Sequence, residues 1–374
     1  MANISVKKHY DRAAGFSLIE ILVGVAIGLI GILVIFQMLS TWDARKRSTT
    51  AGSDAQIAGG ISIFTLERDL KLAGWGFGQA KKEVMGCSVV ANNNTLATPD
   101  VSFRLYPIQI VDGVGGAPDE IQVLYGNSSF FAAARTFTDS TSTQKKAESR
   151  NGFQLGDRVV VADAATPANC ALLEISDNTD TDTLSVDHTT NSYQSAYTAA
   201  GVSTAPRYNQ PVATGVSFVG GGTMYNLGSN PQRRIWNIAN GRTLVWRETL
   251  NSPATTINEV NEGIVDLQAQ YGINTSVVAN AISITWTNVT PTDWTKLLAI
   301  RVGLLARSQQ YEKTAVTAAA PSWEGGTFTM HDIGAAVTVD AGAGSLGPTN
   351  WRNYRYRVYE KVIPLRNVIW GAVP

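Results

Sequence analysis

The sequence predicts an α+β protein in which a long N-terminal hydrophobic helix is joined to a β-rich domain of antiparallel sheets. Residues 16–39 form an almost uninterrupted apolar run, and helical periodicity continues to about residue 73. From Cys87 onward the chain changes to short alternating segments separated by turn residues. We therefore expect three parts, which are a leader at 1–15, a helix at 16–73 and a β-rich globular domain at 74–374.

The apolar run from Phe16 to Leu39 is long enough to cross a membrane. A helix of that length extends about 36 Å, and the hydrocarbon core of a bilayer is about 30 Å thick. The one charge in the run is Glu20. A carboxylate near the start of an otherwise apolar helix costs about 2 to 3 kcal/mol, and such residues usually have a partner. The run therefore predicts a membrane span that carries a functional carboxylate.

A short basic segment precedes the run and ends in Gly15. Because Lys and Arg are enriched on the cytoplasmic side of membrane spans, we expect this segment to stay in the cytoplasm. A peptidase could recognise its small last residue and cut before the apolar run. A secretory signal peptide would instead need an A-x-A-like site after its apolar core, and residues 37–42 contain none. The cations of the segment are Lys7, Lys8 and Arg12.

Gly15, Phe16 and Glu20 resemble the class III signal of the type IV prepilin family, which has Gly, then Phe, then apolar residues with Glu fifth after the cut. The resemblance implies that a prepilin peptidase cleaves after Gly15 and methylates the new amine of Phe16. It also implies that the apolar run becomes a filament-forming helix and that Glu20 acts in subunit assembly. An ordinary signal anchor is the alternative interpretation.

Later segments resemble the minor pilin family PilW in the expected order. The resemblance thus covers most of the chain, strongly at the N-terminus and loosely elsewhere. The resemblance implies a single-pass protein of the bacterial inner membrane with a periplasmic C-terminal domain, which then enters the pilus, at its tip. Its partners would be other minor pilins and the major pilin. The similar segments are 66–74, 156–161, 264–272, 299–308 and 365–367.

The function implied is priming of type IV pilus assembly, in support of twitching motility, adhesion or DNA uptake. Two alternatives remain open. One is a J-like minor pseudopilin of type II secretion, which would act in a short periplasmic pseudopilus. The other is a pilus-tip adhesin that binds a surface ligand through long loops.

The second half of the predicted helix carries two apolar stripes on roughly opposite faces. We expect one stripe to pack on the chain's own sheet and the other to be available to neighbouring subunits; a helix buried on both sides is the alternative. A glycine pair at 59–60 is expected to bend or loosen the helix, and Gly74 to cap it. The first stripe is Ile63, Leu66, Leu70 and Ala73, and the second is Ile57, Ile61, Phe64 and Leu72.

Ten short segments in the β-rich region predict strands, and several alternate with period two. Two stretches rich in small and polar residues, 186–215 and 314–350, are too long for simple turns. They are either exposed loops that reach partners or flexible insertions. Gly113 to Gly116 is expected to close a hairpin. The predicted strands are 120–125, 158–162, 172–176, 215–219, 234–238, 243–248, 264–271, 281–287, 297–307 and 354–363.

The chain has two cysteines, Cys87 and Cys170. If the domain lies outside the cytoplasm, both are in a compartment where disulfides persist, so we expect them to pair. Two separate buried thiols are the alternative. Their spacing fits no zinc-ligand pattern.

Charge and composition give no general bias toward nucleic acid. The chain has 30 basic and 30 acidic residues, and loss of residues 1–15 leaves a net charge of about −2. The alternating Tyr354-Arg355-Tyr356-Arg357 could stack on single-stranded nucleic acid. A strand with one face inward explains the alternation more simply, so direct contact with nucleic acid is not expected.

We predict no catalytic site and no cofactor. The three histidines, His9, His188 and His331, lack a Ser or Cys nucleophile motif, and no phosphate-binding loop occurs. One acidic cluster, residues 177–182, offers oxygen ligands that would suit calcium, but it lacks the glycine and the distal glutamate of an EF-hand. A solvated turn is the favoured interpretation. The weak metal candidates are Asp177, Asp180 and Asp182.

Overall fold

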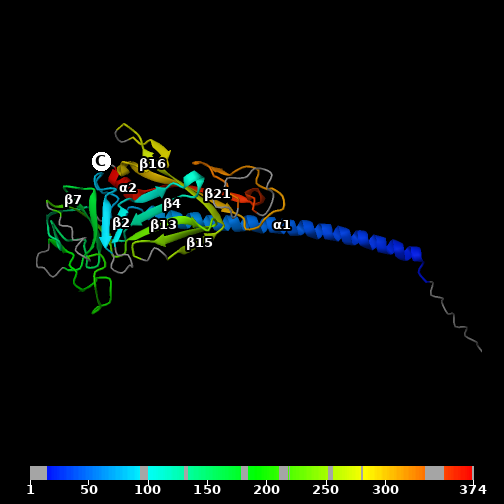
Figure 1. Ribbon diagram of the computed structural model, residues 1–374, viewed down its shortest axis with the longest axis horizontal. Helices are drawn as coiled ribbons and strands as arrows, with labels where there is room; N and C mark the ends of the chain where they lie inside the picture. Colours follow the sequence, from blue (N-terminus) through cyan, green and yellow to red (C-terminus); the bar gives the residue numbers. More distant parts are fainter. Residues whose placement is uncertain are drawn as a thin grey trace, which may run out of the picture. The chain divides into compact units, whose positions relative to one another are not determined.

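The computed structural model describes residues 15–92, 100–129, 134–177, 184–209, 218, 220–251, 256–278, 281–332 and 349–372. The chain divides into two compact units, residues 1–52 and residues 53–374. The long helix α1 (Leu18–Leu72) contributes to both. An N-terminal helix followed by antiparallel sheets confirms the predicted α+β class (Figure 1).

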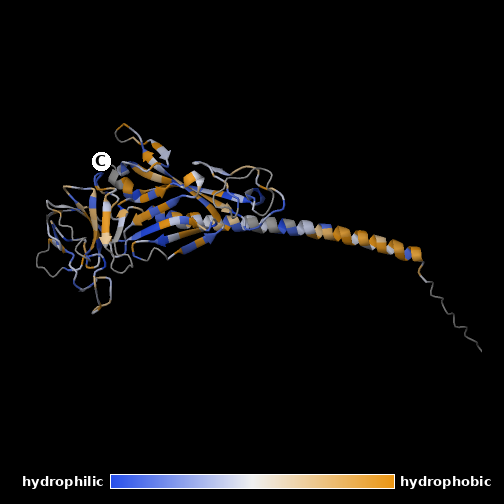
Figure 2. Ribbon diagram, in the orientation of Figure 1, coloured by the Kyte–Doolittle hydropathy of each residue, from blue (hydrophilic) through white to orange (hydrophobic). Residues whose placement is uncertain are grey.

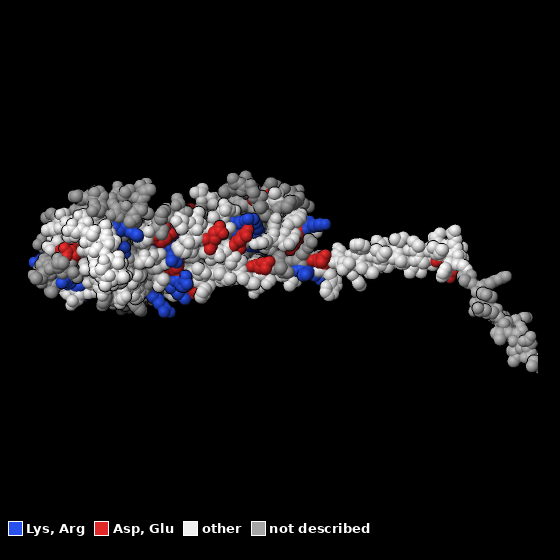
Figure 3. Space-filling model, turned by 90° about the horizontal axis from the view of Figure 1, so that it is seen from below, with Lys and Arg blue, Asp and Glu red and all other residues white. Residues whose placement is uncertain are grey.

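In the first unit, α1 begins as a continuous apolar helix. Its stretch from Leu18 to Asp43 is the one helix in the described part of the chain that is long and apolar enough to span a membrane. None of this stretch is buried against other described residues. Figure 2 shows hydrophobic residues along nearly its whole length, and uncharged residues cover most of its visible face in Figure 3.

In the second unit, three sheets make up most of the β domain. The described strands form an eight-stranded sheet in the order β2-β1-β8-β7-β12-β5-β6-β9, a five-stranded sheet in the order β15-β14-β13-β4-β3, and a four-stranded sheet in the order β17-β16-β18-β21. The pairs are antiparallel except for β1 with β8, which is parallel. In Figure 1, β4, β13, β16 and β21 lie beside the helix, whereas β2 and β7 lie at one end of the domain.

The strands of the first sheet are β1 (Ser88–Asn92), β2 (Asp100–Arg104), β5 (Arg135–Ser140), β6 (Gln144–Ala147), β7 (Arg158–Asp163), β8 (Asn169–Glu174), β9 (Ser185–Asp187) and β12 (Gly222–Gly228). Those of the second are β3 (Ile108–Val111), β4 (Glu120–Tyr125), β13 (Gln232–Ala239), β14 (Thr243–Glu248) and β15 (Asn258–Glu262). Those of the third are β16 (Ile264–Asn274), β17 (Ile284–Thr287), β18 (Leu297–Arg307) and β21 (Tyr356–Pro364).

Shorter elements complete the domain. They are the strand pairs β10 (Tyr193–Gln194) with β11 (Ser203–Thr204) and β19 (Ser322–Trp323) with β20 (Gly326–Thr327), the 3₁₀ turns η1 (Val114–Gly116), η3 (Trp294–Lys296) and η4 (Trp351–Asn353), and the C-terminal helix α2 (Arg366–Ala372).

Most of the predicted strands are confirmed, and β4, β14 and β18 have the predicted bounds. Gly113 to Gly116 lies between the paired strands β3 and β4, so it closes the expected hairpin. The sequence did not predict the other described strands, which are β1, β2, β3, β5, β6, β9, β12, β15 and the short β10, β11, β19 and β20. The predicted strand at 215–219 falls almost entirely outside the described residues.

Period-two alternation places two hydrophobic cores on opposite faces of the eight-stranded sheet. In β7, Val160 and Ala162 face the main core, while Val159 and Val161 face a second core. The main core also contains one face of α1 and the inner faces of the other two sheets. A third, smaller core packs Phe328 and Trp351, from the segment between β18 and β21, with Leu305 of β18.

The two cysteines form the expected disulfide. Cys87 directly precedes β1, and Cys170 lies in β8, with their Cα atoms 5.9 Å apart. Both are buried in the main core. The bond therefore ties the chain that leaves the helix region to the middle of the eight-stranded sheet.

Replacing both Cys87 and Cys170 with Ala should lower the free energy of unfolding by about 2 to 4 kcal/mol, because the bond closes a long loop in the unfolded chain. Urea unfolding of the detergent-solubilised chain measures this loss. Wild-type protein under reducing conditions should approach the stability of the variant. A loss below about 1 kcal/mol would contradict the expectation.

Two buried carboxyl groups lie near β16, and one of them, Asp119, joins the start of β4 to this strand. Asp119 accepts hydrogen bonds from the N–H groups of Gly113, at 2.9 Å, and of Ala269 in β16, at 2.8 Å. Asp266, also in β16, accepts one from the side chain of Gln268 at 3.0 Å. Burial raises the pKa of Asp119 to about 6 and that of Asp266 to about 7.

Asp266→Asn should stabilise the protein more at pH 8 than at pH 4.5. The folded-state pKa of Asp266 is raised above its ordinary value of 3.8, so the wild-type carboxyl becomes increasingly unfavourable as pH rises from about 4 past 7. The difference between variant and wild type should grow by about 1 to 3 kcal/mol across this range. Urea unfolding at the two pH values measures it. Glu259→Gln, at an exposed site in β15, is the control, and a difference independent of pH would refute the assignment.

Candidate functional site

The N-terminal assembly segment lies at the start of α1. Ser17 precedes the helix, and its Oγ accepts a hydrogen bond from the N–H of Glu20 at 3.2 Å. Ser-x-x-Glu at this place has the spacing of a helix-capping box. Glu20 thus lies in the first turn, where the partial positive charge of the helix end favours a carboxylate. Phe16 is 80% exposed, so no other described residue covers the predicted new N-terminus.

Further along α1, in the second unit, the two apolar stripes have different environments. Leu66 and Leu70 are fully buried in the main core. On the opposite face, Phe64 is 67% exposed and Ile61 48% exposed. One stripe packs on the chain's own domain and the other lies open, so the alternative of a helix buried on both sides is wrong. The exposed stripe comprises Ile57, Ile61, Phe64 and Leu72.

Ion pairs fix the buried face of the helix to the sheets. Asp69 is buried and accepts two hydrogen bonds of 2.9 Å from Arg234 of β13. The indole N–H of Trp236 donates to the same carboxylate at 3.2 Å. Nearby, hydrogen bonds from Lys361 of β21 and from Lys71 hold the pKa of Glu67 below its ordinary value.

The glycine pair in α1 does not interrupt the helix, which continues to Leu72. A Cβ atom on Gly59 would lie within 2.1 Å of the Tyr359 ring of β21. The Tyr359 hydroxyl donates to the carbonyl of Gln56 at 2.8 Å. Gly59 therefore allows close packing of helix and sheet rather than a bend. Gly74 has a φ of +78° just after the helix, as expected for a capping glycine, but its N–H donates to the carbonyl of Leu124 and not to the helix.

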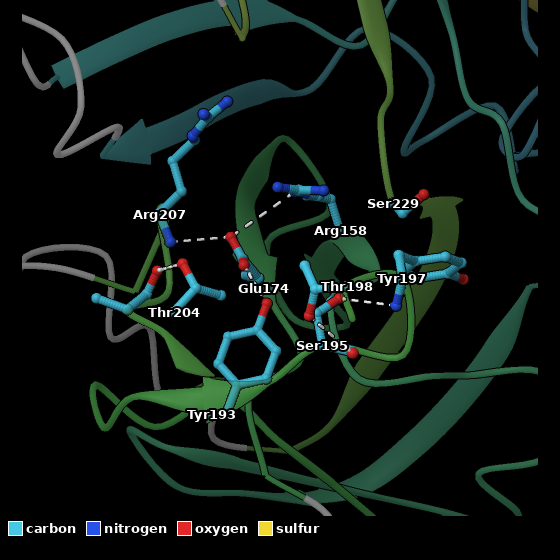
Figure 4. A pocket seen from close by; sticks show the side chains of 11 residues that line it. Arg158, Glu174, Tyr193, Ser195, Tyr197, Thr198, Thr204, Arg207 and Ser229 are labelled. Carbon is cyan, nitrogen blue, oxygen red and sulfur yellow. Dashed lines mark hydrogen bonds and ion pairs between the residues drawn. The ribbon is translucent and has the colours of Figure 1, made fainter. Parts of the chain in front are cut away.

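A polar pocket of about 310 Å³ lies at the end of β7 and β8. The stretch that contains β10 and β11 folds over this end of the sheet (Figure 4). The alternative that this stretch is a flexible insertion is therefore wrong for residues 186–209, because several of their side chains, such as Tyr193 and Tyr208, are buried. The side chains that matter for its chemistry are Arg158, Glu174, Tyr193, Ser195, Tyr197 and Arg207.

Glu174 is the centre of this pocket. Arg158, its cross-strand partner at the start of β7, approaches the carboxylate to 3.7 Å. The hydroxyl of Tyr193 and the backbone N–H of Arg207 donate to the two carboxylate oxygens. Burial, together with the Glu174 charge, raises the pKa of Tyr193 far above its ordinary value, so the phenol remains a donor.

The asparagine and tyrosine that follow β11 anchor this stretch. Asn209 exchanges hydrogen bonds with the backbone of Glu174, accepting at 2.9 Å and donating at 2.6 Å. Tyr208 is fully buried and donates to the carbonyl of Leu250 at 3.0 Å. The end of this stretch is therefore attached both to β8 and to the segment that follows β14.

The weak metal candidates receive no support from the described residues, which contain no cluster of three or more metal-ligating side chains. Asp180 and Asp182 lie outside the described part of the chain. Asp177 forms an isolated antiparallel bridge with Asp187. His188, which the sequence left in a loop, is buried 2.9 Å from the amine of Lys145.

The C-terminal alternation lies at the start of β21, which begins at Tyr356, two residues later than predicted. Tyr354 is buried, whereas Arg355 and Arg357 are exposed. Arg355 pairs with Glu312 at 2.5 Å. These contacts account for the aromatic and basic residues within the domain.

Comparisons with known proteins support these observations. Residues 234–367 match the family model described as Type IV Pilus-assembly protein W, and residues 10–36 match the prokaryotic N-terminal methylation motif. The C-terminal part of the chain is therefore similar to PilW pilus-assembly proteins, and its N-terminus carries a prepilin-type methylation motif. A type IV-like pilin from Thermus thermophilus is similar at 13% identity and a TM-score of 0.21, over 37% of this chain and 66% of its own. A comparison with curated proteins gave no match.

The PilW match covers the strands from β13 to β21, and the methylation motif covers the start of α1. The pocket residues lie between these two regions. Arg158, Glu174 and Tyr193 were not predicted as a site, because they come from separate segments without a motif. The only sequence signal was the unusual length of the polar stretch that begins at residue 186.

Proposed function

We propose that this chain is a minor pilin of the PilW family, which joins other minor pilins in priming type IV pilus assembly at the filament tip. It supports twitching motility, adhesion or DNA uptake through the pilus. Before assembly the chain is held in the inner membrane with its β domain in the periplasm. The family match, which is to a pilus-assembly protein, favours this function over a type II secretion pseudopilin.

The observation that carries the proposal is the one-sided burial of α1. The β domain covers one apolar stripe, and the other leaves Phe64, Ile61 and Ile57 exposed on a helix continuous with the apolar N-terminal run. Exposed apolar side chains in a row favour association. Apolar helices of neighbouring pilins are the partners that we propose for this stripe.

Phe64→Ser should weaken recovery of other minor pilins without destabilising the domain. Phe64 is mostly exposed, so its loss should change the free energy of unfolding by less than about 0.5 kcal/mol. Leu70→Ala, on the buried stripe, should instead cost about 2 to 5 kcal/mol. Co-purification from membranes and urea unfolding measure the two effects.

Val277→Ser is the matched control for the surface change. Val277 is 99% exposed in the turn between β16 and β17, away from the helix stripe. Its substitution should leave partner recovery at the wild-type level. Equal recovery with Phe64→Ser and wild type would contradict a contact through this stripe.

Glu20 is proposed to set the register between subunits. Prepilin cleavage after Gly15 would expose the amine of Phe16, which remains able to carry a positive charge after methylation. In a neighbouring subunit displaced along the filament, that amine can lie beside Glu20. A subunit in another register would leave both charges unpaired in apolar surroundings, which is costly.

Glu20→Ala should reduce recovery in sheared pili while leaving membrane insertion and the β domain intact. Glu20 contacts no other charged side chain in the described part of its own chain. Immunoblots of sheared pili measure incorporation. Mass spectrometry of the mature chain is the control, and it should find N-methylated Phe16 as the first residue in both proteins. Wild-type incorporation of the variant would exclude the charge pairing.

A further inference from the structure

A basic cluster follows the apolar run of α1, on the side that leads to the β domain. The candidate span ends at Asp43, and Arg45, Lys46 and Arg47 come directly after it. Cations beside a span are usual on the cytoplasmic side of a membrane. The function proposed above places this end of the span in the periplasm instead. Three cations at this place therefore call for a counter-charge.

The chain itself does not supply that counter-charge. Arg45 and Lys46 are exposed, and neither side chain has a hydrogen-bond or ion-pair partner among the residues that the structure describes. Asp43 lies within one helical turn of both and forms no ion pair with either. Even with Asp43 counted, two cations against one carboxylate leave a positive charge in excess on this turn. The donors of Arg45 and Lys46 are available to a group outside the chain.

The length of the helix sets these cations at the level of lipid headgroups. Because α1 is continuous from Leu18 to Leu72, Lys46 lies about 42 Å along the axis from Leu18. A bilayer is about 30 Å thick in its hydrocarbon core and about 40 to 45 Å thick with its headgroups. With the start of the helix at one membrane surface, Arg45 and Lys46 therefore reach the headgroups of the opposite surface.

Trp42 independently indicates the same depth. Its side chain is 76% exposed, and it lies about 36 Å along the axis from Leu18, just outside a hydrocarbon core. Tryptophan is enriched at this level of membranes, since the indole is apolar but carries a polar N–H. Arg45 and Lys46 follow Trp42 by three and four residues, so the three side chains lie on one face of the helix.

We propose that Arg45 and Lys46, with Trp42 beside them, bind the phosphate groups of anionic phospholipids on the periplasmic surface of the inner membrane. Both cations form charge-assisted hydrogen bonds with phosphate oxygens. A zwitterionic headgroup carries a cation of its own, so an anionic lipid fits this face better. The proposal rests on the membrane stage of the function proposed above. These contacts hold the subunit at a fixed depth before assembly, and they are lost when the chain leaves the bilayer for a filament.

Electron paramagnetic resonance of spin-labelled lipids tests this contact, with the full-length chain in phosphatidylcholine vesicles. Labelled phosphatidylglycerol should associate with the wild-type chain more strongly than labelled phosphatidylcholine, by about threefold or more. The double substitution Arg45→Gln with Lys46→Gln should remove most of this preference, and glutamine preserves the helix. Sodium chloride at about 1 M should also remove it, because salt screens exposed charges.

Lys81→Gln with Lys82→Gln is the matched control, because it removes two adjacent exposed cations from the second unit, after the end of α1. Its lipid preference should equal that of wild type. The cations of the leader are the same in all three proteins, so they cannot cause a difference between them. An unchanged preference in the Arg45 and Lys46 variant, an equal loss in the control, or a wild-type preference that persists in high salt would overturn the proposal.

Cosedimentation with the vesicles separates this contact from the function on which it rests. Failure of the wild-type chain to sediment with vesicles would overturn the membrane stage and the lipid contact together. Equal association of the two labelled lipids with a membrane-bound wild-type chain would overturn the lipid contact alone, and it would point to an acidic face of another subunit as the counter-charge.

Discussion

One-sided packing of α1 against the β domain is the constraint on which the second unit depends. Leu66 and Leu70 fill the main core, and between them lies Asp69, a buried carboxylate. A buried charge without a partner is strongly unfavourable. The helix is therefore stable only in a position in which Arg234 and Trp236 donate hydrogen bonds to Asp69. Apolar burial thus holds the helix on the sheets, and the ion pair fixes its rotation and its height.

That fixed rotation decides what the helix offers to other molecules. The face opposite Leu66 carries Phe64 and Ile61, and no described part of the domain covers them. Gly59 contributes to the same arrangement, because the missing side chain lets Tyr359 pack against the backbone and bond Gln56. Folding therefore uses one side of the helix and the proposed assembly contact the other, and a substitution on one side need not disturb the other.

The sequence predicted what depends on local pattern and missed what depends on distant pairing. The span, the two stripes and strands such as β18 follow from periodicity, and Cys87 could have only Cys170 as a partner within the chain. β15 was missed because Asn258 to Glu262 is polar and forms a strand only through its pairing with β14. The parallel pairing of β1 with β8 has no local signal at all.

The pocket was missed for the same reason, and its construction shows why it is more than a gap under a loop. Fixing each residue of a long polar stretch costs about 1 to 2 kcal/mol of conformational entropy, which small polar side chains cannot offset by apolar burial. Buried polar contacts at Asn209 and Tyr208 offset part of this cost. Gly156 supports them, since a Cβ there would lie 2.3 Å from Ser195 Oγ. These contacts hold the stretch against β8, so the pocket wall has one arrangement although its sequence has no strong local pattern.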